Sequence, residues 1–154
     1  MGSSTIRTKA VVFDTDKPRQ FEVRQYEIPA EPRPGEALVK LHLAGVCGSD
    51  IHTFVGRASY GVVIPGHEMV GEIVALGEGF TDAHRRPLQV GDRVVPESTM
   101  PCMRCAFCRG FGSRLDKLID YAMCEDYLLW GAIPMRDPVW MNGAYAGYLQ
   151  VPAN

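Results

Sequence analysis

Four of the five cysteines lie close together, and this cluster is the feature that most limits how the chain can fold. Cys102, Cys105 and Cys108 are each separated by two residues, and Cys124 follows later in the chain. Two-residue spacers let thiolates converge on one ion, and a fourth thiolate can complete a tetrahedral shell from a distance. The pattern therefore predicts a metal-binding segment at about residues 100–127, called here the four-cysteine lobe.

Structural zinc is the metal that this cluster favours over the alternatives. An iron–sulfur cluster also uses Cys-x-x-Cys-x-x-Cys, but in the ferredoxin pattern the fourth cysteine follows three residues later and precedes a proline. Here the gap is far longer, and Glu125 follows Cys124. Four ordinary buried cysteines are a poor explanation for so dense a group. Disulfides would suit a secreted chain, but no apolar signal segment is seen at the N-terminus, so thiolates in the cytoplasm are expected.

A second set of candidate metal ligands lies in two short segments further upstream. Cys47 begins the segment Cys-Gly-Ser-Asp-Ile-His, and His67 and Glu68 lie in Gly-His-Glu-Met-Val-Gly. A catalytic zinc takes three protein ligands and leaves its fourth position to water or substrate. Alone, Cys47 would more often be a small buried residue and His67 a hydrogen-bonded one. Together, beside Glu68 and Asp50, they favour a catalytic metal site, where Asp50 is of the right type to accept the histidine ring N–H.

Length and composition describe one ordinary globular domain. The 154 residues are 46% apolar and 22% charged, which leaves room for one hydrophobic core. A formal net charge of −2 gives no electrostatic basis for binding nucleic acid or an anionic membrane surface. No apolar run approaches the length of a membrane span.

The apolar pattern predicts mainly β structure. Alternation is clearest over residues 36–44, where Val39, Leu41 and Leu43 fall on one face. Ser49 and Asp50 are suitable N-cap residues for a short helical turn. Many short strands with Gly and Pro between them indicate a barrel-like core with small helices. No Gly-x-Gly-x-x-Gly follows a strand, so no dinucleotide-binding unit is expected. Other expected elements are strands at 9–13, 21–26, 69–76 and 143–151, a turn at 90–95 that leads into another strand, and a helix near 115–119.

The chain resembles the N-terminal part of the zinc-dependent medium-chain alcohol dehydrogenases. The resemblance rests on the order of its motifs: the two ligand segments, then the turn Gly-Asp-Arg-Val at 91–94, then the four-cysteine lobe. The resemblance covers about residues 9–152. It implies a partly open GroES-like β-barrel over residues 9–154, after a tail at 1–8 that is disordered or left from cloning. It also implies a cytoplasmic oxidoreductase that uses zinc and NAD or NADP on a small alcohol, polyol or carbonyl compound.

The resemblance further implies a role for each candidate site residue. Cys47 and His67 would bind the catalytic zinc, with Glu68 behind it as a transient ligand and Asp50 orienting the histidine. Ser49 would take the alcohol proton and pass it, through the cofactor ribose, towards His52. A hydride would move from a zinc-bound alkoxide to the nicotinamide. The structural zinc would be held by Cys102, Cys105, Cys108 and Cys124.

Two departures from the family pattern bear on these expectations. The stretch from Arg109 to Met123 is longer than the usual spacing before the last lobe cysteine, which indicates an insertion. In the family, the Rossmann domain and the third catalytic zinc ligand lie beyond the position of Asn154, so the isolated chain is expected to be inactive. The alternative is a non-catalytic, zinc-stabilised GroES-like scaffold or one part of a split enzyme. On either interpretation, the face that would meet the Rossmann domain should be exposed and rather apolar, which favours self-association.

Overall fold

Strands make up nearly all of the regular structure. The computed structural model describes residues 4–82, 85–109, 124–136 and 139–152. The single helix in these ranges has seven residues, and none there has the length and apolar character that a membrane crossing requires. The elements are β1 (Thr5–Asp14), β2 (Glu22–Pro29), β3 (Ala37–Ala44), α1 (Gly48–Phe54), β4 (Val62–Val63), β5 (Met69–Leu76), β6 (Arg93–Val94), β7 (Thr99–Met100), β8 (Leu128–Leu129) and β9 (Tyr148–Val151).

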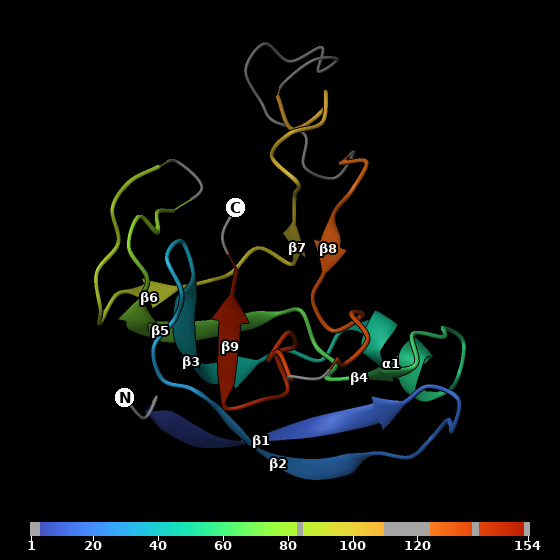
Figure 1. Cartoon of the computed structure of the whole chain (residues 1–154). Coiled ribbons are helices and arrows are strands. Elements are labelled where there is room, and N and C mark those ends of the chain that lie inside the picture. Colours follow the sequence, from blue (N-terminus) through green and yellow to red (C-terminus); the bar gives the residue numbers. More distant parts are fainter. Residues whose placement is uncertain (1–3, 83–84, 110–123, 137–138, 153–154) are drawn as a thin grey trace.

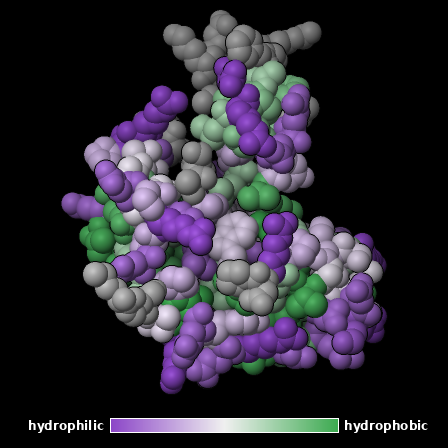
Figure 2. All heavy atoms as spheres, in the orientation of Figure 1, coloured by the Kyte–Doolittle hydropathy of each residue, from purple (hydrophilic) through white to green (hydrophobic). Residues whose placement is uncertain are grey.

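Two sheets form a partly open barrel, which confirms the predicted mainly-β class. One sheet has the strand order β2-β1-β4, and the other has the order β6-β5-β3-β9. The segment before β9 joins them, because the Val11 N–H donates to the Tyr145 carbonyl at 2.8 Å and the Gly147 N–H donates to the Lys9 carbonyl at 3.0 Å. Strands β7 and β8 pair separately and lead into a projection that carries the four-cysteine lobe (Figure 1). In Figure 2 this projection is pale green, with hydrophilic side chains around it.

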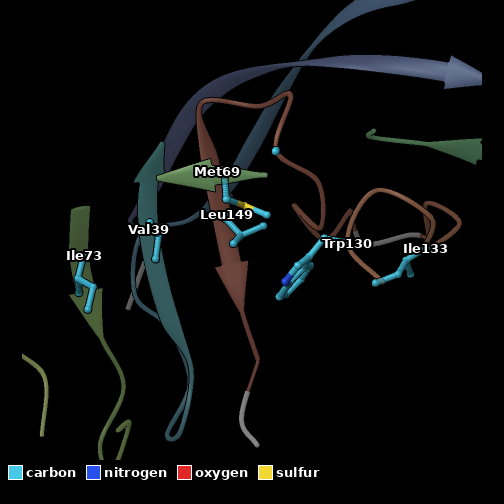
Figure 3. Packing of buried hydrophobic residues seen from close by; sticks show 7 residues of the cluster. Val39, Met69, Ile73, Trp130, Ile133 and Leu149 are labelled. Atoms are coloured by element: carbon cyan, nitrogen blue, oxygen red, sulfur yellow. The ribbon is translucent and has the colours of Figure 1, made fainter. Parts of the chain in front are cut away.

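Two apolar clusters fill the barrel. The first packs Trp130 against residues of β3, β5 and β9. Figure 3 shows the Trp130 ring beside Met69 and Leu149. The second lies between the two sheets, with Ile28, Leu38 and Ile64 fully enclosed. Burying side chains of this size contributes about 1.5–3 kcal/mol each, and this burial is the main favourable term in the stability of such a fold. Neither cluster contains a lobe cysteine.

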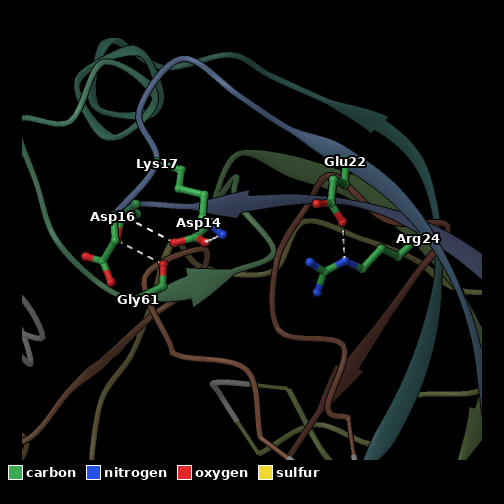
Figure 4. Close-up of polar contacts among 7 residues, drawn as sticks. Asp14, Asp16, Lys17, Glu22, Arg24 and Gly61 are labelled. Carbon is green, nitrogen blue, oxygen red and sulfur yellow. Dashed lines mark hydrogen bonds and ion pairs between the residues drawn. The ribbon is translucent and has the colours of Figure 1, made fainter.

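The turn between β1 and β2 contacts the C-terminal end of α1. The Arg19 N–H donates to the carbonyl of Phe54, the last residue of α1, at 2.6 Å, and the rings of Phe13 and Phe54 lie 5.4 Å apart. An exposed ion pair between Lys17 and Asp14, 3.0 Å apart, lies at this turn (Figure 4) and lowers the pKa of Asp14. Solvated pairs of this kind add little to stability, so α1 is held mainly by the backbone bond and the ring contact.

Three expectations from the sequence need correction. Strand β1 begins at Thr5, so residues 5–8 belong to the sheet and not to the expected tail. Leu43 is 71% exposed, although the alternation of residues 36–44 put it on the face of Val39. The β3–β5 register shifts between Leu41 and Leu43, and such an irregularity reverses which face the following residues occupy. The N-cap of α1 is Cys47, neither Ser49 nor Asp50. The helix expected near 115–119 lies outside the described residues.

Candidate metal centres

The antiparallel pairing of β3 with β5 brings the two upstream ligand segments together. The last pair of this ladder is Ala44 with Met69. Cys47 follows the end of β3 and His67 precedes the start of β5, so both lie beyond the same end of the ladder. One more backbone bond extends the contact, from the Gly45 N–H to the Glu68 carbonyl at 2.8 Å. The sequence places each residue beside a strand, and the pairing makes them neighbours.

Cys47, His67 and Glu68 each direct one possible ligand atom into a common volume. These atoms all lie within 4.8 Å of one another. Cys47 and His67 are half-buried, and Glu68 is exposed. A Cβ atom at Gly45 would overlap the Glu68 carboxylate, so the glycine makes room for that side chain. The set has one soft sulfur donor, one imidazole and one carboxylate on a solvent-facing site, which suits a metal that also receives an exchangeable ligand.

Asp50 lies behind this site and connects its two sides. It is 7% exposed, and one carboxylate oxygen, Oδ2, accepts the backbone N–H of Cys47 at 2.9 Å. The other oxygen, Oδ1, faces Nδ1 of His67 at 3.8 Å. With Nδ1 turned to the carboxylate, Nε2 is the ring nitrogen left for a metal.

Tyr145 is a neighbour of this site that sequence reasoning missed. Its hydroxyl donates to Oδ2 of Asp50 at 3.0 Å, across a separation of 95 residues. Burial, together with the negative charge of Asp50, raises the pKa of Tyr145 well above its ordinary value, so the phenol remains protonated and is a donor at neutral pH. The alternation of residues 143–151 predicted a strand that included Tyr145, but β9 begins only at Tyr148. Nothing in the pattern pointed to Asp50.

Ser49 and His52 lie on α1, which begins directly after Cys47. Both residues are exposed. Their backbone carbonyls accept bonds within and just after the helix, from the Thr53 hydroxyl at 3.0 Å and from the Arg57 N–H at 2.8 Å. The side chains are thus accessible from solvent on the helix that carries Asp50.

The four lobe cysteines form a second group of converging donors. Strands β7 and β8 pair through Thr99 with Leu129 and Met100 with Leu128, which brings the two ends of the lobe side by side. The sulfur atoms all lie within 4.8 Å of one another, and Cys108 and Cys124 are buried. Cys124 therefore lies with the other three despite the long stretch before it, of which residues 110–123 lie outside the described part of the chain. An ion pair between Arg104 and Asp126 crosses the same segment.

Backbone N–H groups point at the lobe sulfurs. Cys124 accepts from the Cys102 N–H at 3.2 Å, Cys102 from the Cys105 N–H at 3.4 Å, and Cys105 from the Cys108 N–H at 3.5 Å. The Cys108 N–H lowers the pKa of Cys105 to about 6, and burial raises the pKa of Cys108 to about 12. Four converging sulfurs, three of them with amide donors behind them, fit the closed tetrahedral shell of structural zinc.

Comparison with known proteins agrees with this architecture. Residues 33–154 match the profile of the alcohol dehydrogenase GroES-like domain. The chain belongs to this family. Within it, the domain is 35% identical over 147 residues to an erythritol/L-threitol dehydrogenase of Mycolicibacterium smegmatis, covering 88% of this chain and 36% of that protein. It is 34% identical over 152 residues to the zinc-type alcohol dehydrogenase B of Aspergillus flavus, covering 97% of this chain and 30% of that protein.

A solved structure gives the same result in three dimensions. The alcohol dehydrogenase TADH from Thermus sp. ATN1 superposes with a TM-score of 0.72 at 36% sequence identity, covering 94% of this chain and 37% of that one. This alcohol dehydrogenase GroES-like domain thus spans about a third of the length of the relatives it matches, 36% and 30% for the two dehydrogenases above. The family and fold that the sequence predicted are confirmed.

Proposed function

We propose that this chain is the zinc- and substrate-binding part of a zinc-dependent alcohol or polyol dehydrogenase that uses NAD or NADP. The observation that carries the proposal is the convergence of Cys47, His67 and Glu68 within 4.8 Å, on a fold shared with dehydrogenases. The four-cysteine lobe provides the second, closed site that structural zinc requires. The names of the relatives, which act on alcohols and on the polyols erythritol and threitol, support this substrate class.

Each residue of the open site has a defined task in this proposal. Cys47 and His67 hold the metal, and Glu68 stands beside them as an exchangeable carboxylate. Zinc, when bound there, supplies a Lewis acid that lowers the pKa of a bound alcohol. As the Ser49 hydroxyl accepts the alcohol proton it gives up its own, which would move towards His52, three residues further along α1, and from there to solvent. Both side chains are exposed, as a proton route requires.

Large apolar side chains around Cys47 support a partner on this side of the domain. Leu43, Val46 and Ile51 are 71%, 70% and 54% exposed, and they flank Cys47 in the chain. Apolar groups gathered beside a site commonly mark a surface that binds a ligand or another domain. These residues would contact the substrate, the nicotinamide or the nucleotide-binding part of the enzyme.

Metal content tests the proposal directly. We expect about two zinc ions per chain, by elemental analysis of protein purified without chelator, and about one in Cys47→Ser or His67→Ala. His42→Ala is the matched control, because His42 is an exposed histidine of β3 that is not among the converging donors. It should keep both ions. One zinc in the wild type that Cys47→Ser does not change would instead favour a zinc-stabilised scaffold.

Turnover tests whether this domain needs a nucleotide-binding domain in order to form reduced cofactor. We expect residues 1–154 to show no NADH or NADPH formation with erythritol, threitol or simple alcohols, because the dehydrogenase relatives are about three times as long. A longer protein that joins this domain to a nucleotide-binding domain should form reduced cofactor, and Cys47→Ser should abolish it. Reduced cofactor formed by residues 1–154 alone would contradict this expectation.

A further inference from the structure

We infer that Tyr145 is a positioning residue of the Cys47–His67 site, whose hydroxyl holds Asp50 in the orientation that serves both metal-binding residues. The inference rests on the proposed function, because it assigns Tyr145 to the metal site named there.

Asp50 reaches the site through two different atoms. Oδ2 accepts the Cys47 N–H at 2.9 Å and the Tyr145 hydroxyl at 3.0 Å, while Oδ1 faces the His67 ring at 3.8 Å. A rotation of the carboxylate would therefore disturb the cysteine and the histidine together. The Cys47 N–H belongs to the same helix start as Asp50, so it moves with it. The Tyr145 hydroxyl comes from another part of the fold and is a reference point outside α1.

Tyr145 is itself fixed by several backbone bonds. Its carbonyl accepts the Val11 N–H at 2.8 Å, and its N–H donates to the Pro65 carbonyl at 3.0 Å. The adjacent Ala144 N–H donates to the Gly66 carbonyl at 2.9 Å. Strand β1 and the turn before His67 therefore hold the tyrosine in place. Only the side chain of Tyr145, through its hydroxyl, contacts Asp50.

The ring of Tyr145 also packs on the turn that precedes His67. A Cβ atom at Gly66 would lie within 2.8 Å of two ring carbons, so the ring rests directly on the glycine. One side chain thus contacts both ligand-bearing segments, through its ring on the His67 side and through its hydroxyl on the Asp50 side. A phenylalanine would keep the first contact and lose the second. Oδ2 of Asp50 would then keep only the Cys47 N–H as a donor, so the carboxylate would be held less firmly. The loss of such supporting contacts typically weakens metal binding about 10–100-fold.

Tyr145→Phe isolates the hydroxyl, and cadmium-113 provides a probe for zinc at both centres. Cadmium bound by four sulfurs and cadmium bound by one sulfur with nitrogen and oxygen give separate resonances, so the lobe serves as an internal reference. In competition with a chelator, we expect Tyr145→Phe to weaken cadmium binding at the Cys47–His67 site about tenfold and to leave the lobe unchanged. Tyr148→Phe is the matched control, because this half-buried tyrosine of β9 packs in the second apolar cluster. Equal affinities at the Cys47–His67 site for wild type and Tyr145→Phe would overturn the inference.

The route through Asp50 is tested by combining substitutions. In an Asp50→Ala background, Tyr145→Phe should cause no further loss of cadmium affinity, because the group that it positions is gone. Fully additive losses would show that Tyr145 acts by another route and would overturn the inference.

A metal-free measurement separates this inference from the proposed function. We expect the nitrogen resonances of the His67 ring in the metal-free protein, assigned with His67→Ala, to shift in Tyr145→Phe and not in Tyr148→Phe. No cadmium at the Cys47–His67 site of the wild type would overturn the proposed function. The histidine spectrum would still decide the role of Tyr145, and an unchanged His67 ring would overturn it.

Discussion

Replacing Cys105 by serine is expected to remove one zinc ion and to open the four-cysteine lobe while the barrel stays folded. The lobe is linked to the barrel by the short β7–β8 pair, and neither apolar cluster includes a lobe cysteine. We therefore expect the fold of the lobe to depend on a bound metal. Structural zinc in small sites contributes an apparent binding free energy of roughly 10–16 kcal/mol, so losing it outweighs any other contact in this segment. Limited proteolysis should show new cleavage between residues 100 and 127.

The barrel provides the internal control for this variant. Trp130 follows β8 directly and is anchored by its indole N–H to the Glu97 carbonyl at 2.8 Å, so the base of the lobe is fixed from the core side. Circular dichroism and the fluorescence of the two tryptophans should therefore stay close to those of the wild type. Cys47→Ser is the matched comparison, since it should lose a zinc ion without new cleavage in the lobe. A Cys105→Ser protein that resists proteolysis like the wild type would show that the lobe folds without metal.

The residue pattern was sufficient for much of the fold and for the identity of the donors. Strand β5 (Met69–Leu76) matches its predicted range, because the Pro65-Gly66 turn precedes this apolar segment and Gly77 ends it. The lobe was predictable because two-residue spacers restrict three cysteines to one turn. These features are local, so short stretches of sequence carry them.

What the sequence withheld depends on contacts between distant segments. The exposure of Leu43 follows from the register of β3 against β5, and a pattern read along one strand does not contain the irregularity. The bond from Tyr145 to Asp50 depends on how the segment before β9 runs alongside β1 and the turn at residues 65–66. Likewise, Cys47 and His67 were each placed at a strand end, but their contact needs the antiparallel β3–β5 pair. Pairing and register come from the whole fold. The site lies where β3 pairs with β5 and where the segment before β9 contacts both β1 and the turn at residues 65–66.

Gly143→Ala is the substitution that tests this convergence most severely. A Cβ atom at this buried glycine would overlap the Ile64 carbonyl and lie 2.8 Å from the Pro65 oxygen. The atoms that would clash belong to the backbone, so rotating a side chain cannot relieve the overlap. Overpacking usually costs about 1–3 kcal/mol, and a clash with backbone on both sides should place this variant at about 3 kcal/mol in the free energy of unfolding, measured with urea.

The effect should also reach the metal site, because the displaced segments are those that carry its ligands. Moving residue 143 outward breaks the bonds that hold residues 144 and 145 to the turn before His67, so zinc at the Cys47–His67 site should be lost while the lobe keeps its own. Gly48→Ala is the matched control: it lies next to Cys47, but a Cβ atom there has no atom within 4 Å, and alanine suits a helix better than glycine. It should unfold at the wild-type urea concentration or slightly above. If both alanine variants behaved alike, the close approach of residue 143 to Ile64 could not be what holds His67 in place.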